Sequence, residues 1–253
     1  MSNSLDGYAV FITGGSTGFG LSHARVLGSR GARIAITDFK DENLANAKTA
    51  LKGDGIAALC LKADNRVATE IAGAVAAAEN EFGKLDVVVN NAGITGMMAP
   101  IEEIDEAFFD DLFDTHVKGA FFAVRAAVPG MKKRKFGRII NTGSTFAMTG
   151  SPAMSHYAGA KGALTALARS WAREFAPYGI TVNTVSPGFA DTPMTRRDVS
   201  PEIFKEIIEG MALKRQVLPE EISYAVAWLA SREADAVTGQ NISPNCGQAI
   251  VGI

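Results

Sequence analysis

Hydrophobic residues in this chain alternate between two arrangements from one end to the other. Short runs rich in Val, Ile and Thr are followed by longer segments in which apolar residues recur at every third or fourth position. The first arrangement is typical of strands buried on both faces, and the second of amphipathic helices. The predicted strands are residues 8–13, 33–38, 57–61, 85–90, 138–142, 180–185 and 241–243. The predicted helices are residues 18–29, 41–51, 67–82, 105–131, 155–176 and 219–230.

Strand and helix alternate throughout the chain. This alternation predicts right-handed crossovers and an α/β fold with a doubly wound parallel sheet of about seven strands and helices on both faces. No linker rich in Pro, Gly or Ser divides the sequence, and no internal repeat exists beyond the alternation itself. We therefore expect residues 1–253 to form a single domain. Residues 187–201 lack periodicity and are rich in proline and polar residues, which predicts a loop there.

Composition argues against several classes of function. Of the residues, 47% are hydrophobic and 21% charged, and the net charge of -2 comes from interleaved acidic and basic residues, so we expect no nucleic acid partner. The longest apolar runs, such as residues 225–230, are far shorter than the roughly 20 residues that span a bilayer. The first residues lack the cationic start and apolar stretch of a secretion signal. We therefore expect a cytoplasmic protein with Cys60 and Cys246 as free thiols.

A glycine-rich turn follows the first predicted strand and precedes the first helix. Glycines at such a turn let the backbone pass close to a pyrophosphate, which then sits on the N-terminus of the helix. Glycine also serves ordinary strand–helix turns, but the position after the first strand of an α/β chain favours a dinucleotide site. The candidate cofactor-binding residues in this turn are Gly14, Ser16, Thr17, Gly18, Phe19 and Gly20.

Further motifs follow the turn, which reads Thr-Gly-x-x-x-Gly-x-Gly. They are Asn90-Asn91-Ala92-Gly93 after the fourth strand, Ser144 and Tyr157-x-x-x-Lys161 after the fifth, and Pro187-Gly188 with Thr192 after the sixth. In these motifs and their order, the chain resembles the short-chain dehydrogenase/reductase family along essentially its whole length. The resemblance implies a Rossmann-like dinucleotide-binding and catalytic domain with a substrate loop at about 187–215. It also implies an enzyme that transfers a hydride between a nicotinamide ring and an alcohol or carbonyl carbon.

The same resemblance extends the cofactor site beyond the glycine turn. Asp64 and Asn65 would lie beside the adenine, with Asp64 accepting from its amino group, although an Asp-Asn pair also simply forms turns. Tyr157 would lie near the nicotinamide, and Lys161 would hold its ribose. The other implied cofactor residues are Asn91, Gly93, Pro187, Gly188, Ala190 and Thr192.

Asp38, at the end of the second predicted strand, favours NAD over NADP. A carboxylate there accepts hydrogen bonds from the adenosine ribose hydroxyls and repels a 2′-phosphate. Phe39 follows it, and Thr17 stands in the glycine turn, so neither position supplies a cation for a phosphate. The alternative is that Asp38 only caps the following turn.

Tyr157 and Lys161 are four residues apart, so on a helix they share one face. A neighbouring ammonium and a positive nicotinamide ring both favour tyrosinate, and we expect them to lower the phenol pKa from about 10 toward neutrality. Tyr157 would then exchange a proton with the substrate oxygen as the hydride moves. Ser144 would hydrogen-bond the substrate oxygen and stabilise the developing alkoxide.

His116 departs from the family pattern, because many relatives carry asparagine at this place before a Val/Leu-Lys-Gly sequence. That asparagine positions a water that links the lysine to solvent. An imidazole with a pKa near 6.5 suits proton relay, so we include His116 among the catalytic candidates. The alternative is a tolerated replacement without a role. His23 and His156 are more typical of structural residues, and no cluster has metal-ligand spacing.

Three segments would wall the substrate pocket by resemblance: residues 94–100, 145–156 and 189–197. Phe146 and Phe189 make them mainly apolar, so the predicted substrate is a mainly hydrophobic secondary alcohol, bound by these residues together with Ser144 and Tyr157. One alternative is an NAD(P)H-dependent ketone or 3-oxoacyl-carrier-protein reductase, and a more distant one is a non-catalytic NAD-binding regulator. Relatives commonly form tetramers through their long helices, so a homotetramer is expected.

Overall fold

The computed structural model describes residues 4–95 and 98–251. Within these residues, seven strands form one parallel sheet in the order β3-β2-β1-β4-β5-β6-β7. The strands are β1 (Ala9–Ile12), β2 (Arg33–Asp38), β3 (Ala58–Lys62), β4 (Val87–Asn90), β5 (Gly137–Thr142), β6 (Ile180–Val185) and β7 (Asn241–Ile242). The predicted doubly wound parallel sheet is therefore confirmed, and each strand lies within a few residues of its predicted position.

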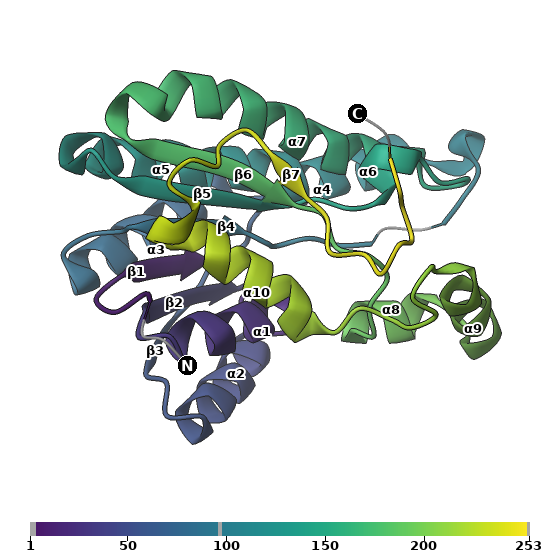
Figure 1. Cartoon of the computed structure of the whole chain (residues 1–253), viewed down its shortest axis with the longest axis horizontal. Coiled ribbons are helices and arrows are strands. Elements are labelled where there is room, and N and C mark those ends of the chain that lie inside the picture. The colour runs from purple at the N-terminus through teal and green to yellow at the C-terminus, as the bar shows by residue number, and fades with distance from the viewer. Residues whose placement is uncertain (1–3, 96–97, 252–253) are drawn as a thin grey trace.

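Helices cover both faces of this sheet (Figure 1). One face carries α1 (Gly18–Gly28), α2 (Asp41–Gly53) and α10 (Pro219–Ala230), and the other carries α3 (Ala68–Phe82), α5 (Gly119–Arg134) and α7 (Ser155–Phe175). Successive residues of a strand enter opposite cores: Val10 and Ile12 pack with the first group of helices, and Ala9 and Phe11 with the second. Burial on both faces explains why these strands are apolar along their whole length.

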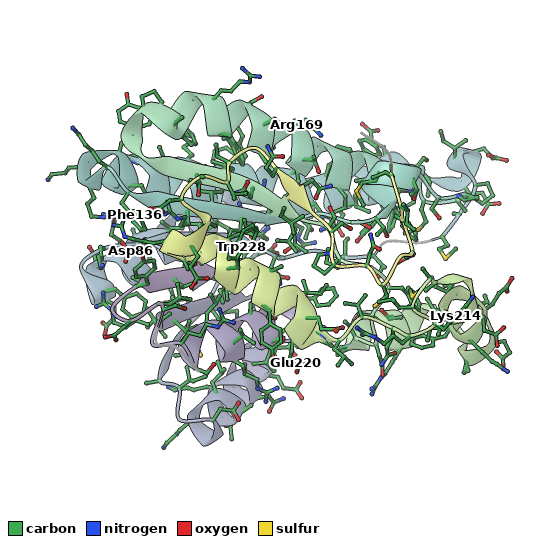
Figure 2. All side chains as sticks on the ribbon, in the orientation of Figure 1. Asp86, Phe136, Arg169, Lys214, Glu220 and Trp228 are labelled. Carbon is green, nitrogen blue, oxygen red and sulfur yellow. The ribbon has the colours of Figure 1, made fainter. Side chains whose placement is uncertain are left out.

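Trp228 helps to pack α10 against the hydrophobic core beneath α1 and α2. It lies on α10 (Figure 2) and packs, partly buried, against the core shared by α1, α2 and the sheet. Cys60 is packed against the same core, and both Cys60 and Cys246 are free thiols, as expected. No helix among the described residues is long and apolar enough to cross a membrane.

The helix predicted over residues 105–131 is present but is interrupted. It consists of α4 (Glu106–Phe113), a π-helical turn (Asp114–Lys118) and α5. Asp105 caps its start, because its carboxylate accepts a hydrogen bond from the Phe108 N–H at 2.7 Å. A π-turn inserts one extra residue and changes which side chains face inward. Here it brings His116 inside, with 2% of its surface exposed.

The loop predicted at about 187–215 is wrong in part, because most of it is helical. It contains α8 (Pro193–Asp198) and α9 (Pro201–Gly210), and the short helix α6 (Phe146–Thr149) follows β5. Thr192 and Ser200 cap α8 and α9, and a proline follows each cap. The sequence contains these start signals, but the helices are too short for a clear period. Figure 1 shows α6, α8 and α9 together at one end of the molecule.

Candidate active site

The predicted site residues lie on segments that follow the carboxyl ends of the strands. The glycine turn follows β1, Asp38 ends β2, Asn91 and Gly93 follow β4, Ser144 follows β5, and the segment 187–192 follows β6. In a doubly wound sheet these ends form one edge, and ligands bind where the strand order reverses. The reversal lies between β1 and β4, which are direct neighbours although two strands separate them in sequence.

Thr13 links the glycine turn to the segment after β4. Its hydroxyl accepts hydrogen bonds from the backbone N–H groups of Asn91 and Ala92, both at 3.0 Å. In return, Asn91 Nδ2 donates to the carbonyls of Thr13 (3.2 Å) and Gly14 (3.0 Å). The Asn91 side chain therefore shapes the turn itself. Thr13 is absent from the binding residues predicted above, although a hydroxyl at a strand end next to glycines is a recognisable signal.

Two glycines of the turn are required by close backbone approach. Gly14 has a φ of +59°, and a Cβ there would lie 2.8 Å from the Cα of Ala92. A Cβ on Gly20 would lie 2.1 Å from the carbonyl oxygen of Gly14. A larger residue at either position would force the turn apart.

The N-terminus of α1 is open to an anion. Thr17 is its N-cap residue but makes no side-chain capping hydrogen bond, and the first turn contains no acidic residue. A Cβ on Gly18 would meet only Thr192, at 3.9 Å, so the turn faces open space there. Uncapped N–H groups and the helix dipole attract phosphate. These residues fit the pyrophosphate of a dinucleotide, and Phe19 lies behind them with its ring stacked on His23 at 6.4 Å.

Asp38 is held by groups from three directions. Its Oδ1 accepts the backbone N–H of Lys40 at 2.9 Å, and Nδ2 of Asn43 lies 3.3 and 3.4 Å from the two carboxylate oxygens. The hydroxyl of Ser16, in the glycine turn, donates to Oδ2. Capping of the next turn accounts for the Lys40 contact but not for the contact with Ser16. Asn43 was not predicted, because it is one of many polar residues on α2.

Asp64 and Asn65 have different surroundings. Arg66 holds Asp64 through Nε–Oδ1 and Nη2–Oδ2 contacts of 2.9 and 2.6 Å, and these hydrogen bonds lower the pKa of the carboxyl group. The same guanidinium contacts Asp111 of α4 at 2.6 Å. Asn65 is buried, and its amide donates to the carbonyl of Thr115 in the π-turn. Asp64 therefore stays at the rim of the site, whereas Asn65 ties the loop after β3 to the long helix.

The segment after β6 is held by backbone contacts. Gly188 donates to the carbonyl of Pro244 at 3.0 Å, and a Cβ on Gly188 would lie 2.5 Å from the Cα of Asn245. Ala190 forms an isolated parallel bridge with Val217. Pro187 precedes this glycine, and Thr192 ends the segment as the cap of α8. Of the predicted residues of this segment, Thr192 lies nearest the glycine turn, opposite Gly18.

Ser144, Tyr157 and Lys161 form one cluster. The hydroxyl of Ser144 lies close enough to the phenol of Tyr157 to lower its pKa, and Ser144 Oγ accepts the N–H of Phe146 at 3.1 Å. Lys161 Nζ donates to the carbonyl of Thr142 at 2.8 Å and lies 5.7 Å from the centre of the Tyr157 ring. Lys161 is 3% exposed, whereas Tyr157 remains partly accessible, as a group that meets a substrate must be.

Burial moves the pKa values of this cluster in opposite directions. It raises the pKa of Tyr157 to about 12, against the hydrogen bond from Ser144, which lowers it. It lowers the pKa of Lys161 to about 7. The groups that the protein itself supplies therefore do not make the phenol acidic, and the expected effect of Lys161 together with a nicotinamide stays a prediction. Both groups are driven toward their neutral forms, because a charge is poorly solvated in this site.

His116 lies against the same cluster. Its ring is perpendicular to that of Tyr157, with centres 5.6 Å apart, and its Nε2 lies 2.7 Å from the carbonyl oxygen of Ile94. Burial, aided by the charge of Lys161, lowers the His116 pKa well below its usual value. The expected pKa near 6.5 is therefore wrong. The imidazole stays neutral near pH 7.

Of the two aromatic residues predicted to meet the substrate, Phe146 lies beside Tyr157. The ring of Phe146, on α6, is perpendicular to the Tyr157 ring at 6.3 Å, whereas Phe189 packs against Phe204 of α9 at 5.0 Å. Phe189 is fixed by its backbone N–H, which donates to Gln248 Oε1 at 2.7 Å. Of the predicted wall 94–100, residues 96 and 97 lie outside the described residues.

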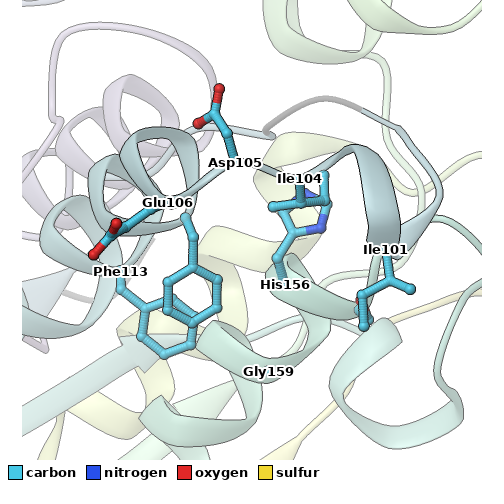
Figure 3. A pocket seen from close by; sticks show the side chains of 9 residues that line it. Ile101, Ile104, Asp105, Glu106, Phe113, His156 and Gly159 are labelled. Atoms are coloured by element: carbon cyan, nitrogen blue, oxygen red, sulfur yellow. The ribbon is translucent and has the colours of Figure 1, made fainter.

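His156, next to Tyr157 in sequence, belongs to another cavity. Figure 3 shows it next to Ile104, and Phe113 lines another part of the same cavity, which has a volume of about 480 Å³ and lies between α4 and α7. Consecutive helical residues point about 100° apart. His156 therefore faces this cavity, and Tyr157 faces Ser144.

Known proteins are similar to the chain over nearly its whole length. A family profile described as enoyl-(acyl carrier protein) reductase matches residues 14–249. The chain is 36% identical over 257 residues to 2-(S)-hydroxypropyl-CoM dehydrogenase 3 of Xanthobacter autotrophicus, covering 99% of this chain and 100% of that protein. It is 34% identical over 247 residues to the 3-oxoacyl-(acyl-carrier-protein) reductase of Rickettsia prowazekii, covering 98% and 99%. The structure of NAD⁺-bound xylitol dehydrogenase matches with a TM-score of 0.91 and 29% identity, covering 96% of this chain and 99% of that one.

The buried lysine predicts a pH-dependent stability. Lys161→Met should raise the free energy of unfolding at pH 7 by about 1–3 kcal/mol, because apolar replacement of a buried charged group is commonly stabilising. The folded-state pKa of Lys161 is lowered to about 7 from 10.5. Between these values only the unfolded parent binds the proton, so the parent gains stability as pH rises through this window. The advantage of the variant should shrink from pH 7 to pH 10 in urea unfolding.

The exposed Lys48 on α2 provides the matched control. Lys48→Met should show no difference from the parent that depends on pH in this window. An advantage of Lys161→Met that stays constant with pH would contradict the lowered pKa.

Proposed function

The chain belongs to the short-chain dehydrogenase/reductase family, and we propose that it catalyses the NAD-dependent oxidation of a mainly hydrophobic secondary alcohol to its ketone, and the reverse reduction. Like its relatives it is an oxidoreductase that uses a nicotinamide cofactor. The observation that supports the proposal most is the cluster of Ser144, Tyr157 and Lys161, which lies at the same edge of the sheet as the uncapped N-terminus of α1. A non-catalytic regulator would not need this cluster.

The proposed cofactor site runs along the carboxyl edge of the sheet. The glycine turn and the N-terminus of α1 would hold the pyrophosphate, Asp38 the adenosine ribose, Asp64 the adenine edge, and Lys161 the nicotinamide ribose. When bound, the oxidised nicotinamide supplies a hydride acceptor and a positive charge that favours tyrosinate. Residues 1–253 act in this proposal as one dinucleotide-binding and catalytic domain, and residues 187–215 cover the substrate.

Side chains of the protein itself carry out the proton transfer. In alcohol oxidation, Tyr157 takes the hydroxyl proton, and in reduction it returns the proton to the carbonyl oxygen. Ser144 Oγ accepts the Phe146 N–H, so its own proton is available for the substrate oxygen or the phenol. Lys161 contributes an ammonium whose direction is set by the Thr142 carbonyl. The phenol pKa of about 12 keeps Tyr157 protonated in the protein alone, which suits proton donation in reduction.

NAD rather than NADP is supported by the surroundings of Asp38. Ser16, Asn43 and the Lys40 N–H hold the carboxylate at the end of β2, next to the glycine turn. A fixed negative charge repels a 2′-phosphate. The nearby ammonium of Lys40 lies over the Phe39 ring, 5.3 Å from its centre.

The cationic side chains of this region are already paired with protein groups, which supports an uncharged substrate. Arg196 binds Asp191 through two contacts of 2.6 and 2.8 Å, and Arg215 binds Glu221 through contacts of 2.8 and 2.7 Å. Lys214, near α9 in Figure 2, donates to the Glu209 carbonyl. These cations therefore already have partners, while Phe146 and Phe189 supply apolar walls.

Reduction of a 3-oxoacyl group is the second candidate, because the relative from Rickettsia prowazekii is a 3-oxoacyl-(acyl-carrier-protein) reductase. Rates with a 3-oxoacyl thioester and NADH or NADPH, compared with rates for apolar ketones, distinguish the two functions.

We also propose that the protein is cytoplasmic and forms a homotetramer. Phe109 on α4 and Phe121 on α5 are each more than two-fifths exposed, which supports burial of this surface between copies.

Tyr157→Phe should reduce kcat by about 10²–10⁴-fold, because it removes the group that exchanges the proton. The assay follows NADH absorbance during oxidation of an accepted alcohol. Tyr178→Phe, at an exposed tyrosine remote from the cluster, is the matched control and should keep the parent rate. Reduction of NAD by Tyr157→Phe at the speed of the parent would refute the mechanism.

Asp38→Ala should lower kcat/KM for NAD by about 10–100-fold, because hydrogen bonds to a charged group are lost, and it should raise kcat/KM for NADP. Asp41→Ala removes a more exposed carboxylate three residues away and should change neither value. A parent that prefers NADP, or an Asp38→Ala enzyme with unchanged preference, would contradict the assignment of NAD.

The apolar approach predicts the substrate range. Cyclic and long-chain secondary alcohols should be oxidised with kcat/KM at least about 10-fold above polyols and sugar acids of similar size, given about 0.8 kcal/mol for each buried methylene. A panel of alcohols with NAD, assayed by NADH absorbance, tests this. Turnover confined to polyols or sugar acids would exclude the proposed substrate class.

A further inference from the structure

The chain turns sharply after β7, and we refer to residues 244–248 as the C-terminal turn. Cys246 and Gly247 both have left-handed backbones, with φ of +53° and +76°. The side chain of Asn245 closes the turn, because it accepts the Gly247 N–H at 2.8 Å and donates to the Ala249 carbonyl at 3.0 Å. Local hydrogen bonds of an asparagine therefore define the course of the chain here.

Both ends of the segment that contains α8 and α9 contact the C-terminal turn. At the first end, the N–H of Gly188 donates to the carbonyl of Pro244 at 3.0 Å. At the second end, the N–H of Leu213 donates to the carbonyl of Cys246, also at 3.0 Å. Figure 1 shows the chain after β7 beside the chain that leads into α8. The C-terminal turn is therefore a common base for the two ends of this segment.

The backbone of Phe189 is held on both sides. Its N–H donates to Oε1 of Gln248 at 2.7 Å, and its carbonyl accepts the N–H of Val217 at 3.1 Å. A backbone N–H can only donate, so the Gln248 amide must present its oxygen at this point. The Phe189 ring packs against that of Phe204, with centres 5.0 Å apart. Phe189 therefore joins the C-terminal turn, the segment after β6 and α9.

Gln248 supplies the part of this arrangement that depends on a side chain. The contacts of Gly188 and Leu213 with the C-terminal turn join backbone to backbone, so they depend little on which side chains are present. The contact of Gln248 with Phe189 is lost as soon as the oxygen acceptor is removed. A partly buried N–H without a partner is unfavourable, so the backbone at Phe189 would then open more often.

We propose that Gln248 is a positioning residue for substrate binding: its carboxamide oxygen fixes the backbone of Phe189 and thereby holds α9 over the substrate. The inference rests on the proposed function, in which residues 187–215 cover the substrate. It adds to that function a residue of the C-terminal turn, which acts through Phe189 and Phe204 rather than on the reacting atoms.

Hydrogen exchange tests the contact without an assay of activity. Gln248→Met keeps the length of the side chain but removes the oxygen, so the Phe189 amide should exchange about 3- to 10-fold faster, as expected for one lost hydrogen bond. Gln248→Glu keeps an oxygen and should restore the protection of the parent. Gln240→Met, at an exposed glutamine that donates to the Thr238 carbonyl at 3.1 Å, is the matched control and should exchange like the parent. Mass spectrometry of peptides that contain Phe189 follows the exchange in the full chain.

Kinetics with NAD and 2-octanol give the readout that is specific to positioning. Gln248→Met should raise KM for the alcohol about 3- to 10-fold and leave kcat within about 2-fold, because it removes binding that substrate and transition state share. The kcat is kept because Lys161 is fixed by the Thr142 carbonyl, which the substitution does not touch. The Kd for NAD, measured by fluorescence quenching, should change less than about 3-fold, since Gly188 keeps its contact with Pro244. Gln248→Glu should return KM to near the parent value.

Three outcomes would overturn the inference. They are an exchange rate or a KM that stays at the parent value in Gln248→Met, a Gln248→Glu enzyme as impaired as Gln248→Met, and a kcat that falls as far as kcat/KM. Should Gln248→Met fail to fold, Gln248→Ala removes the same oxygen with fewer atoms to accommodate. Failure of the proposed function gives a different result: Tyr157→Phe would keep full activity or 2-octanol would not be oxidised, while the exchange of Phe189 would still respond to Gln248→Met.

Discussion

The cost of keeping charge away from water governs the cluster of Ser144, Tyr157 and Lys161. Tyr157 and Lys161 share one face of α7, and burial drives both toward neutrality, with pKa values of about 12 and about 7. An ordinary tyrosine–lysine pair on a helix surface would keep both pKa values near 10, and neither group would respond strongly to a new charge. In this site a single positive charge brought close to the phenol acts through a poorly screening medium. The cluster is therefore sensitive to what binds beside it.

Backbone groups at the ends of the strands hold the side chains of this cluster in place. Lys161 is fixed by the carbonyl of Thr142, Ser144 by the N–H of Phe146, and His116 by the carbonyl of Ile94. Each of these backbone groups belongs to the end of a parallel strand or to the segment after it. Because β4 and β5 are paired in a fixed register, the backbone groups that hold these side chains are fixed relative to one another.

The predictable parts of the fold and the site are those with a local signal. Strands buried on both faces and long amphipathic helices lie where periodicity places them, and the glycine turn, Asp38 and Tyr157 with Lys161 lie at one edge because parallel strands end there. The short helices α8 and α9 were missed, since ten residues or fewer carry little periodicity. The π-turn has no distinctive composition. The pKa directions were also missed, because they depend on desolvation, which requires knowing what surrounds each group.

Desolvation is not the only constraint that a sequence pattern hides: Gly93 and His116 are in contact although they lie on different segments of the chain. Glycine at position 93 is not required by a left-handed backbone, because its φ is not positive. It is required because the imidazole occupies the space that a side chain would take. A glycine of the segment after β4 and a residue of the long helix are therefore one steric unit. A sequence pattern read segment by segment cannot show such a unit, since the constraint exists only where the two segments meet beside the phenol.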